Sequence, residues 1–233
     1  MKKIKLMTLG LCFLTLTSGM TSCATKQGTG TLAGAGGGAV LGGIIGNIIG
    51  KNTKGTAIGA AIGAAIGGGA GTLIGRHMDK VAQEAAAQVQ NAKVEEVTDA
   101  NGLKAVKVTF DSGILFATNK AVLNQTSKDE LAKFSTVLKN NQDCYVDIYG
   151  HTDSTGNDGI NIPLSNNRAQ SVQSYLQQCG VPASQFKNVT GKGSAEPVAD
   201  NTTKEGRQQN RRVEVYLYAS QSMVDAANAG TLK

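Results

Sequence analysis

The hydrophobic and polar positions follow three different patterns along the chain, and each pattern predicts a different kind of structure. Residues 6–16 form an apolar run with few polar breaks, whereas residues 34–75 carry glycine at nearly every fourth position. From about residue 95, strand-like alternation and helix-like spacing of apolar residues follow one another. We therefore expect a leader, a repetitive helical segment and a globular α/β domain, in that order.

Residues 1–22 have the layout of an export signal peptide. Lysines at positions 2, 3 and 5 precede the apolar run, and small residues follow it. The run is shorter than the ~20 apolar residues that a membrane-spanning helix needs. A cleaved signal is therefore favoured over a retained membrane anchor.

Cys23 follows this leader directly, in the sequence Met20-Thr21-Ser22-Cys23-Ala24. The arrangement resembles a bacterial lipobox, except that Met20 stands where leucine is usual. We therefore expect lipidation of Cys23, which would anchor the chain because each acyl methylene buried in a bilayer contributes ~0.8 kcal/mol. Ala24 is not an aspartate retention signal, which favours an outer-membrane lipoprotein facing the periplasm over an inner-membrane one.

A spacing of four divides the glycine-rich segment into two series. They are Gly34, Gly38, Gly42, Gly46 and Gly50, and then Gly55, Gly59, Gly63, Gly67, Gly71 and Gly75. On a helix this spacing puts each series on one face, where backbones can approach closely. With a polar turn at residues 51–54, residues 32–75 are predicted to form a glycine-zipper helical hairpin, preceded by a lipidated tether over residues 23–31. Insertion into a membrane and self-packing as a homo-oligomer both stay open, and a flexible linker is the plain alternative.

Residues 76–97 have the spacing of a further helix, with Val81, Ala85 and Val89 along one face. We expect residues 76–94 to form a helical linker that acts as a spacer or lateral contact, without chemistry of its own. The globular domain is then expected over residues 95–220, and no role is assigned to the C-terminal tail, residues 221–233.

Within the globular domain the apolar period switches between that of a strand and that of a helix. Strands are expected over residues 94–98, 103–110, 145–149 and 213–218, and helices over residues 121–139 and 165–178. The sequence Asp99-Ala100-Asn101-Gly102 supplies a hairpin turn between the first two strands. From the second strand onward, the order β-α-β-α-β predicts an α/β sandwich.

Charge and glycine are both concentrated outside this domain. The chain has 233 residues, a net charge of +6 and 30 glycines. The positive excess lies in residues 1–75, and residues 76–233 are neutral overall. A neutral domain has no basic surplus with which to neutralise phosphates, so nucleic acid is not an expected partner. The glycines lack a period of three, which excludes collagen.

Several motifs of the domain have the spacing of one known family. They are Gly150-His151-Thr152-Asp153-x-x-Gly156, Asn161-x-x-Leu164-Ser165-x-x-Arg168-Ala169, Tyr175-Leu176, Gly180-Val181, Gly191-x-Gly193 and Asn210-Arg211-Arg212-Val213-Glu214. Through these motifs, residues 95–220 resemble the OmpA-like peptidoglycan-binding domain, the family of the OmpA C-terminal domain, Pal and MotB. With its signal peptide, lipobox and glycine series, the whole chain resembles a YiaD-type glycine-zipper lipoprotein.

The resemblance implies binding, without cleavage, of the meso-diaminopimelate residue in the stem peptide of peptidoglycan. By resemblance, Asp153 accepts the ammonium group of this ligand, and Arg168 holds its carboxylate from the start of the second helix. The partial positive charge of that helix N-terminus would also favour an anion. The other residues implied in peptidoglycan binding are Thr152, Asn161, Arg211 and Arg212.

Several of these residues also have ordinary structural interpretations. Without the resemblance, Asp153 would be expected to cap a turn and Arg168 to pair with a surface acid. Asn161 and Ser165 are expected mainly to shape the loop and cap the helix. Of the two neighbouring arginines at positions 211 and 212, one is expected to reach the ligand and the other to be a solvated strand residue.

Cys144 and Cys179 are the cysteines that remain after signal processing, and both are expected at the end of the domain away from the ligand loop. Export to an oxidising compartment permits a disulfide between them, and two buried thiols are the alternative. His151 stands without a nucleophile, a second histidine or metal-ligand spacing. We therefore expect no enzymatic activity, no metal and no cofactor.

Taken together, the patterns predict a lipid-anchored envelope protein that tethers a membrane to the cell wall. One alternative is a wall-anchored component of a channel or stator, although no Asp or Glu precedes Asp79, which weakens a proton-driven version. A second alternative is an oligomeric glycine-zipper scaffold that uses the wall only for position. A third is a cell-wall hydrolase.

Overall fold

A five-stranded mixed sheet lies at the centre of the computed structural model, which describes residues 68–117 and 119–232. The strands are β1 (Ala92–Thr98), β2 (Lys104–Asp111), β3 (Cys144–Gly150), β4 (Phe186–Gly191) and β5 (Arg212–Ala219). Their spatial order is β1-β2-β5-β3-β4; β3 and β4 are parallel and the other neighbouring pairs are antiparallel. The leader, Cys23, the tether and residues 32–67 of the predicted hairpin lie outside the described residues.

The β1–β2 hairpin forms where the alternation and the turn signal predicted it. Ala92 pairs with Phe110 and Thr98 with Lys104 across the ladder. At the turn, one carboxylate oxygen of Asp99 accepts hydrogen bonds from the backbone N–H groups of Asn101 and Leu103, both at 2.8 Å. Gly102 adopts a positive φ of 78° there, a conformation that glycine adopts without steric cost.

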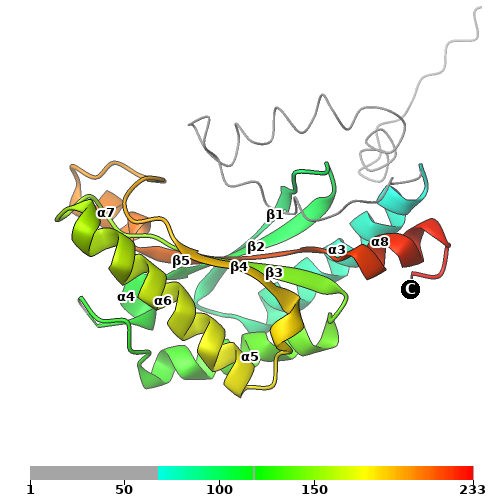
Figure 1. The fold of residues 1–233 in the computed structure, drawn as a ribbon, viewed down its shortest axis with the longest axis horizontal. Coiled ribbons are helices and arrows are strands. Elements are labelled where there is room, and N and C mark those ends of the chain that lie inside the picture. Colours follow the sequence, from blue (N-terminus) through cyan, green and yellow to red (C-terminus); the bar gives the residue numbers. More distant parts are fainter. Residues whose placement is uncertain (1–67, 118, 233) are drawn as a thin grey trace, which may run out of the picture.

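The helices pack mainly against one face of the sheet (Figure 1). They are α3 (Ala70–Gln88), α4 (Ser112–Leu115), α5 (Gln125–Asn140), α6 (Asp158–Gln178), a short 3-10 turn η2 (Ala183–Gln185), α7 (Lys204–Asn210) and α8 (Gln221–Asn228). Alternate strand residues such as Val108, Ile148 and Val215 are fully buried beneath them in one hydrophobic core. The expected α/β sandwich is therefore confirmed.

Helix α3 differs from the helix expected over residues 76–97 at both ends. It begins at Ala70, inside the second glycine series, and it ends at Gln88, because residues 92–98 pair with β2. Its buried face includes Ile74, Met78 and Val81, each at most 1% exposed, and these side chains join the core of the sheet. Of the two roles expected for this helix, a spacer or a lateral contact, its packing favours the contact, since the helix is an integral part of the described fold.

Five further elements were not predicted, and one helix begins earlier than expected. The missed elements are strand β4, helices α4, α7 and α8, and the 3-10 turn η2. Helix α8 lies in the tail to which no role was assigned, yet its Met223 and Val224 are buried and it packs on α3. Helix α6 starts at Asp158 rather than at Ser165 and continues through Pro163. A proline near the start of a helix removes few backbone hydrogen bonds, so it did not mark the boundary.

The opposite face of the sheet carries a cluster of tyrosines and acids in place of aliphatic side chains. Tyr149, Tyr216 and Tyr218 are each at most 4% exposed. The carboxylate of Asp147 accepts hydrogen bonds from the hydroxyls of Tyr149 at 3.0 Å and Tyr218 at 3.1 Å, and from the amide of Asn188. The buried acid is therefore fully hydrogen-bonded on this face.

Cys144 and Cys179 are both free, so the predicted disulfide is absent from the structure. Cys144 begins β3 and Cys179 ends α6, which places both away from the loop after β3, as expected. The Cys144 thiol is fully buried and contacts the sulfur of Met78 in α3 at 3.9 Å. The Cys144 sulfur therefore packs against α3, a helix whose place in the core was not predicted.

Within residues 68–117 and 119–232, no helix combines the length and apolar character needed to cross a bilayer.

Candidate functional site

Two glycines bring α6 into direct contact with the ends of β3 and β4. A Cβ atom at Gly150 would lie 2.1 Å from the carbonyl oxygen of Ser165, and one at Gly191 would lie 2.2 Å from the backbone nitrogen of Asn166. No other residue type leaves this space, so glycine is required at both positions. The loop that follows β3 is therefore held directly beside α6.

Asp153 lies in this loop with its carboxylate held by two donors. Arg211 Nη1 is 2.5 Å from one carboxylate oxygen, and the backbone N–H of Thr155 donates to the other at 2.8 Å. Burial raises the pKa of Asp153, but the hydrogen bonds from Arg211 and Thr155 outweigh it and leave the pKa below its usual value. Asp153 is therefore a carboxylate at neutral pH.

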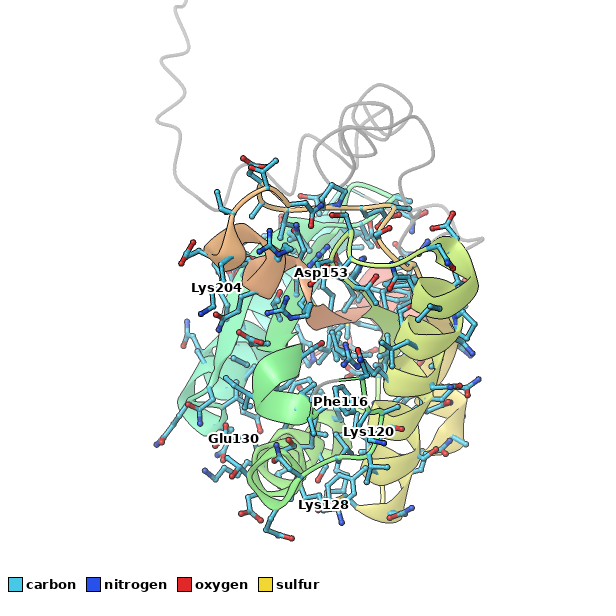
Figure 2. All side chains as sticks on the ribbon, turned by 90° about the vertical axis from the view of Figure 1, so that its left-hand side faces the viewer. Phe116, Lys120, Lys128, Glu130, Asp153 and Lys204 are labelled. Atoms are coloured by element: carbon cyan, nitrogen blue, oxygen red, sulfur yellow. The ribbon has the colours of Figure 1, made fainter. Side chains whose placement is uncertain are left out.

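Arg168 supplies a buried cation at the same end of the domain. It is 3% exposed, its Nε donates to the backbone carbonyl of Lys120 at 3.0 Å, and its guanidinium lies 5.2 Å from the ring centre of Phe116. Burial and the charge of Arg211 lower the pKa of Arg168, while the charge of Asp153 raises it. Figure 2 looks onto this end of the molecule, with Asp153 above Phe116 and Lys120.

The Arg168 guanidinium keeps donor capacity for a ligand. Among the described residues, only its Nε has a hydrogen-bond partner, the carbonyl of Lys120. A guanidinium has five N–H donors, so the two terminal nitrogens remain to bind a carboxylate in a fork. The ring of Phe116 supports one face of the group and fixes the plane of that fork.

Asn161 and Thr152 complete the loop around Asp153. The Asn161 amide donates to the backbone carbonyls of Asp153 at 3.4 Å and Thr155 at 3.1 Å, which confirms that it shapes the loop. The backbone N–H of Thr152 donates to the carbonyl of Gly193 at 2.9 Å. The Thr152 hydroxyl is buried and has no hydrogen-bond partner among the described residues.

Ser165 does not cap a helix, contrary to expectation. It lies within α6, where its hydroxyl donates to the carbonyl of Ile162 at 2.9 Å and accepts from the backbone N–H of Gly193 at 3.0 Å. Arg168 likewise lies about three turns beyond the helix start at Asp158. The positive end of a helix acts only within its first turn, so the expected help from the α6 N-terminus does not reach Arg168.

Arg212 is directed away from this group, and it is not a solvated residue. Its side chain is 5% exposed, with Nε 2.7 Å from the carboxylate of Glu214 and Nη2 donating to the carbonyl of Glu196. The structure thus brings together five of the six candidates, namely Thr152, Asp153, Asn161, Arg168 and Arg211. Arg212 lies on the tyrosine-bearing face of the sheet instead.

Buried His151 lies on the same face of the sheet as Arg212 and Glu214. Its Nε2 lies 3.6 Å from the carboxylate of Glu214. Burial lowers the pKa of His151 and the charge of Arg212 lowers it further, whereas Glu214 raises it; the net shift is downward. The histidine next to Asp153 in sequence therefore belongs to the packing of the sheet.

The sequence interpretation missed Phe116 and the backbone carbonyl of Lys120. Both lie in or next to the segment between β2 and α5 that showed no regular period. They reach Arg168 only through the tertiary fold, so no local pattern could identify them.

The site thus presents one carboxylate and one guanidinium at the same end of the domain, near enough for each charge to act on the other. Such a pair is complementary to a small zwitterion, with an ammonium on the Asp153 side and a carboxylate on the Arg168 side. Residues 115–211 match the OmpA family. The resemblance noted from the motifs is confirmed, and residues 1–79 additionally match the YMGG-like Gly-zipper family.

Part of this chain is similar to several known proteins. The chain is 36% identical over 135 residues to "Probable lipoprotein YiaD" of Escherichia coli, covering 55% of this chain and 61% of the relative. It is 40% identical over 110 residues to the outer-membrane lipoprotein YfiB of Pseudomonas aeruginosa, covering 47% and 65%. It is 41% identical over 113 residues to the peptidoglycan-binding protein ArfA of Mycobacterium tuberculosis, covering 48% and 34%. The matches thus span less than two thirds of each relative's length.

Solved structures contain the same fold. The cell wall anchor of the type VI secretion system (T6SS) from Pseudomonas aeruginosa has a TM-score of 0.51 and 28% identity, covering 63% of this chain and 99% of that one. A MotB-like protein from Desulfovibrio vulgaris has a TM-score of 0.51 and 23% identity, covering 65% and 92%. These neighbours confirm the mixed α/β architecture of the OmpA-like domain.

Proposed function

We propose that the OmpA-like domain binds peptidoglycan without cleaving it, and that it holds the meso-diaminopimelate residue of the stem peptide. The observation that supports the proposal is that buried Arg168 and the ionised carboxylate of Asp153 occupy the same end of the domain and interact electrostatically. Diaminopimelate presents an ammonium and a carboxylate on one carbon, which matches this charge pair. The relative ArfA is named a peptidoglycan-binding protein, and one structural neighbour is a cell wall anchor.

Each side chain has a defined role in this proposal. Asp153 accepts the ligand ammonium, and its carboxylate has lone pairs beyond those used by Arg211 and Thr155. The terminal nitrogens of Arg168 hold the ligand carboxylate, because its Nε is engaged by Lys120. Arg211 keeps Asp153 ionised and oriented. Thr152 offers its hydroxyl, and Asn161 holds the loop in shape.

Co-sedimentation of the detergent-solubilised full-length protein with purified sacculi tests the function. Asp153→Ala and Arg168→Ala should each weaken binding by about 30-fold or more, since removing one partner of a buried charge pair costs ~2–5 kcal/mol. Arg76→Ala is the matched control, because Arg76 is an exposed arginine on α3 and should not affect binding. Wild-type binding by both site variants would overturn the assignment.

The choice of ligand is tested with sacculi of two chemistries. Sacculi with lysine in place of diaminopimelate lack the carboxylate that Arg168 is proposed to hold. Wild type should prefer diaminopimelate sacculi, and Arg168→Ala should lose that preference. Equal binding to both sacculi would exclude diaminopimelate while leaving peptidoglycan binding itself in place. Incubation with sacculi followed by muropeptide analysis should release no fragments, and release would overturn the non-catalytic assignment.

Lipidation of Cys23 would place this domain on a membrane and make the chain a tether to the wall. Two relatives are named as lipoproteins, one of them an outer-membrane lipoprotein. Labelling with radioactive palmitate should mark the wild-type chain and leave Cys23→Ser unmarked. Labelling of Cys23→Ser at the wild-type level would refute the anchor, and fractionation of the labelled chain distinguishes the outer from the inner membrane.

A further inference from the structure

A second group of polar side chains gathers at the end of the domain opposite Asp153. His77 comes from α3, Asp143 directly precedes β3, and Cys144 is the first residue of β3. One nitrogen, one carboxylate oxygen and one sulfur of these residues lie within 4.8 Å of one another. The His77 Nε2 and the Asp143 carboxylate are 3.5 Å apart. Strand β3 separates this group from the ligand loop.

The packing of α3 on the sheet fixes the group in place. Met78, next to His77, is 1% exposed and its sulfur contacts that of Cys144 at 3.9 Å. The backbone carbonyl of Asp143 accepts from the N–H of Ser220 at 3.1 Å, and that of Cys144 accepts from the side-chain amide of Gln185 at 3.3 Å. The backbone that carries the oxygen and the sulfur is therefore held on both sides.

The group lies at the boundary between the core and the solvent. The Cys144 side chain is fully buried, whereas the side chains of His77 and Asp143 are 17% and 33% exposed. A metal ion held by the three would therefore have sulfur on its buried side and nitrogen and oxygen on its solvent side.

The donor set is the one that zinc prefers. Imidazole nitrogen, thiolate sulfur and carboxylate oxygen bind Zn²⁺ at ~2.0–2.3 Å, which puts tetrahedral ligands roughly 3.3–3.8 Å apart. The observed upper limit of 4.8 Å requires the side chains to close by about 1 Å. Three protein ligands leave the fourth position of a tetrahedral ion to water or another group.

We propose that His77, Asp143 and Cys144 form a binding site for a divalent transition metal of the zinc class, which clamps α3 onto the start of β3. This site is independent of the peptidoglycan site, since it uses none of the same residues. It also gives Cys144 a role other than the disulfide with Cys179 that the sequence suggested.

Cobalt titration of the detergent-solubilised full-length chain tests the site, because Co²⁺ bound to thiolate has a sulfur-to-metal charge-transfer band in the near ultraviolet. The wild-type chain should show one such band, and Zn²⁺ should displace it. Cys144→Ser should abolish the band. Cys179→Ser, which changes the other cysteine of the described domain, should retain it.

Asp143→Asn provides a second variant, because it leaves the buried sulfur and the backbone contacts in place. It should weaken Co²⁺ binding by at least about 10-fold, as should His77→Gln, since even second-shell changes at metal sites cost 10- to 100-fold. Zn²⁺ should raise the melting temperature of wild type more than that of either variant. Absence of the thiolate band in wild type, its persistence in Cys144→Ser, or unchanged affinity in both other variants would overturn the site.

Discussion

Arg211 and Arg212 are neighbours in the chain, yet their guanidinium groups lie in opposite environments. The Arg212 side chain is 5% exposed, and the carboxylate of Glu214 and the carbonyls of Asn210 and Glu196 accept its hydrogen bonds. The Arg211 side chain is 37% exposed and contacts the carboxylate of Asp153. Two identical side chains therefore hold two acids in very different ways.

The difference lies in how much hydrogen-bonding capacity remains. Glu214 receives Arg212 at 2.7 Å and the hydroxyl of Tyr216 at 2.6 Å, within a face of the sheet that is fully buried around it. Burial raises the pKa of Glu214, but the neighbouring His151 imidazole and the charge of Arg212 outweigh it, so the pKa lies well below its usual value. The buried Arg212–Glu214–Tyr216 network stabilises the fold, whereas the Asp153 group keeps capacity for a ligand.

The largest expected effect is the loss of stability in Arg212→Met. This change leaves the Glu214 carboxylate buried without its cation, which typically costs ~3–5 kcal/mol in the free energy of unfolding. Arg211→Met should cost less than this, because Arg211 itself is 37% exposed and Asp153 keeps the hydrogen bond from the Thr155 N–H. Urea denaturation followed by circular dichroism measures both changes. Equal losses would show that the two ion pairs contribute equally to the free energy of unfolding.

A double variant shows where the cost arises. Arg212→Met combined with Glu214→Met removes both charges and should recover much of the lost stability, because a buried ion pair replaced by apolar groups is often near neutral. No recovery would mean that packing of the arginine stem, and not the unpaired acid, sets the loss.

The next largest effect concerns binding. Arg211→Ala should weaken co-sedimentation with sacculi by roughly tenfold or more, since a hydrogen bond to a charged group contributes ~1.5–3 kcal/mol. Arg212→Met, examined at a temperature where it is folded, should bind as wild type does. A reversal of these two outcomes would assign the recognition role to the wrong arginine.

A smaller effect should appear in the pH dependence of stability. The pKa of His151 is lowered in the folded state, so the unfolded chain takes up a proton first as the pH falls below ~6.5. This contribution to stability is therefore present above pH ~6.5 and is lost as the pH falls toward the folded pKa.

His151→Gln removes that contribution. The stability of wild type relative to this variant should decrease as the pH is lowered from 7 to 5, and urea denaturation at each pH measures it. Comparison with the variant cancels the contributions of other titrating groups to the pH dependence. Asp99 is one of them: burial raises its pKa to about 6, although its hydrogen bonds lower it. A difference that is constant with pH would show that His151 titrates normally.

The smallest expected effect concerns Thr152, whose hydroxyl is buried without a partner among the described residues. Thr152→Val keeps the shape of the side chain and should change the free energy of unfolding by less than about 1 kcal/mol. Its binding to sacculi should fall by roughly two- to tenfold, as expected for one neutral hydrogen bond. A loss of stability without a loss of binding would mean that Thr152 has a structural role and does not contact the ligand.

The elements that could be predicted are those with a strong local signal. The β1–β2 hairpin combines alternation with the Asp99–Gly102 turn, and α5 and β5 have clear apolar periods. Strand β4 was not predicted because its residues are partly buried and partly exposed without a clear alternation. It lies at an edge of the sheet, where it pairs with β3. Helix α3 was found, but its burial depends on α8 and the sheet, which are distant in sequence.

The candidate site divides in the same way. Asp153 and Arg168 were identified through family motifs, and the fold brings them to one end of the domain. The support of Arg168 by Phe116 and by the carbonyl of Lys120 depends on long-range contacts and leaves no trace in local sequence. To choose between Arg211 and Arg212, one must know that β5 begins at Arg212, because the side chains of the two neighbours point in opposite directions there.

Helix α3 enters the domain at the end marked by α8 (Figure 1). Asp153 follows the other end of β3 and contacts Arg211 at the end of α7. Strands β3 and β5 run between these two ends as an antiparallel pair from Cys144–Ala219 to Gly150–Val213. A pull between a wall-bound ligand and the chain before residue 70 would act along these strands. Their hydrogen bonds lie across that direction and would carry the load together, in shear, instead of opening one at a time.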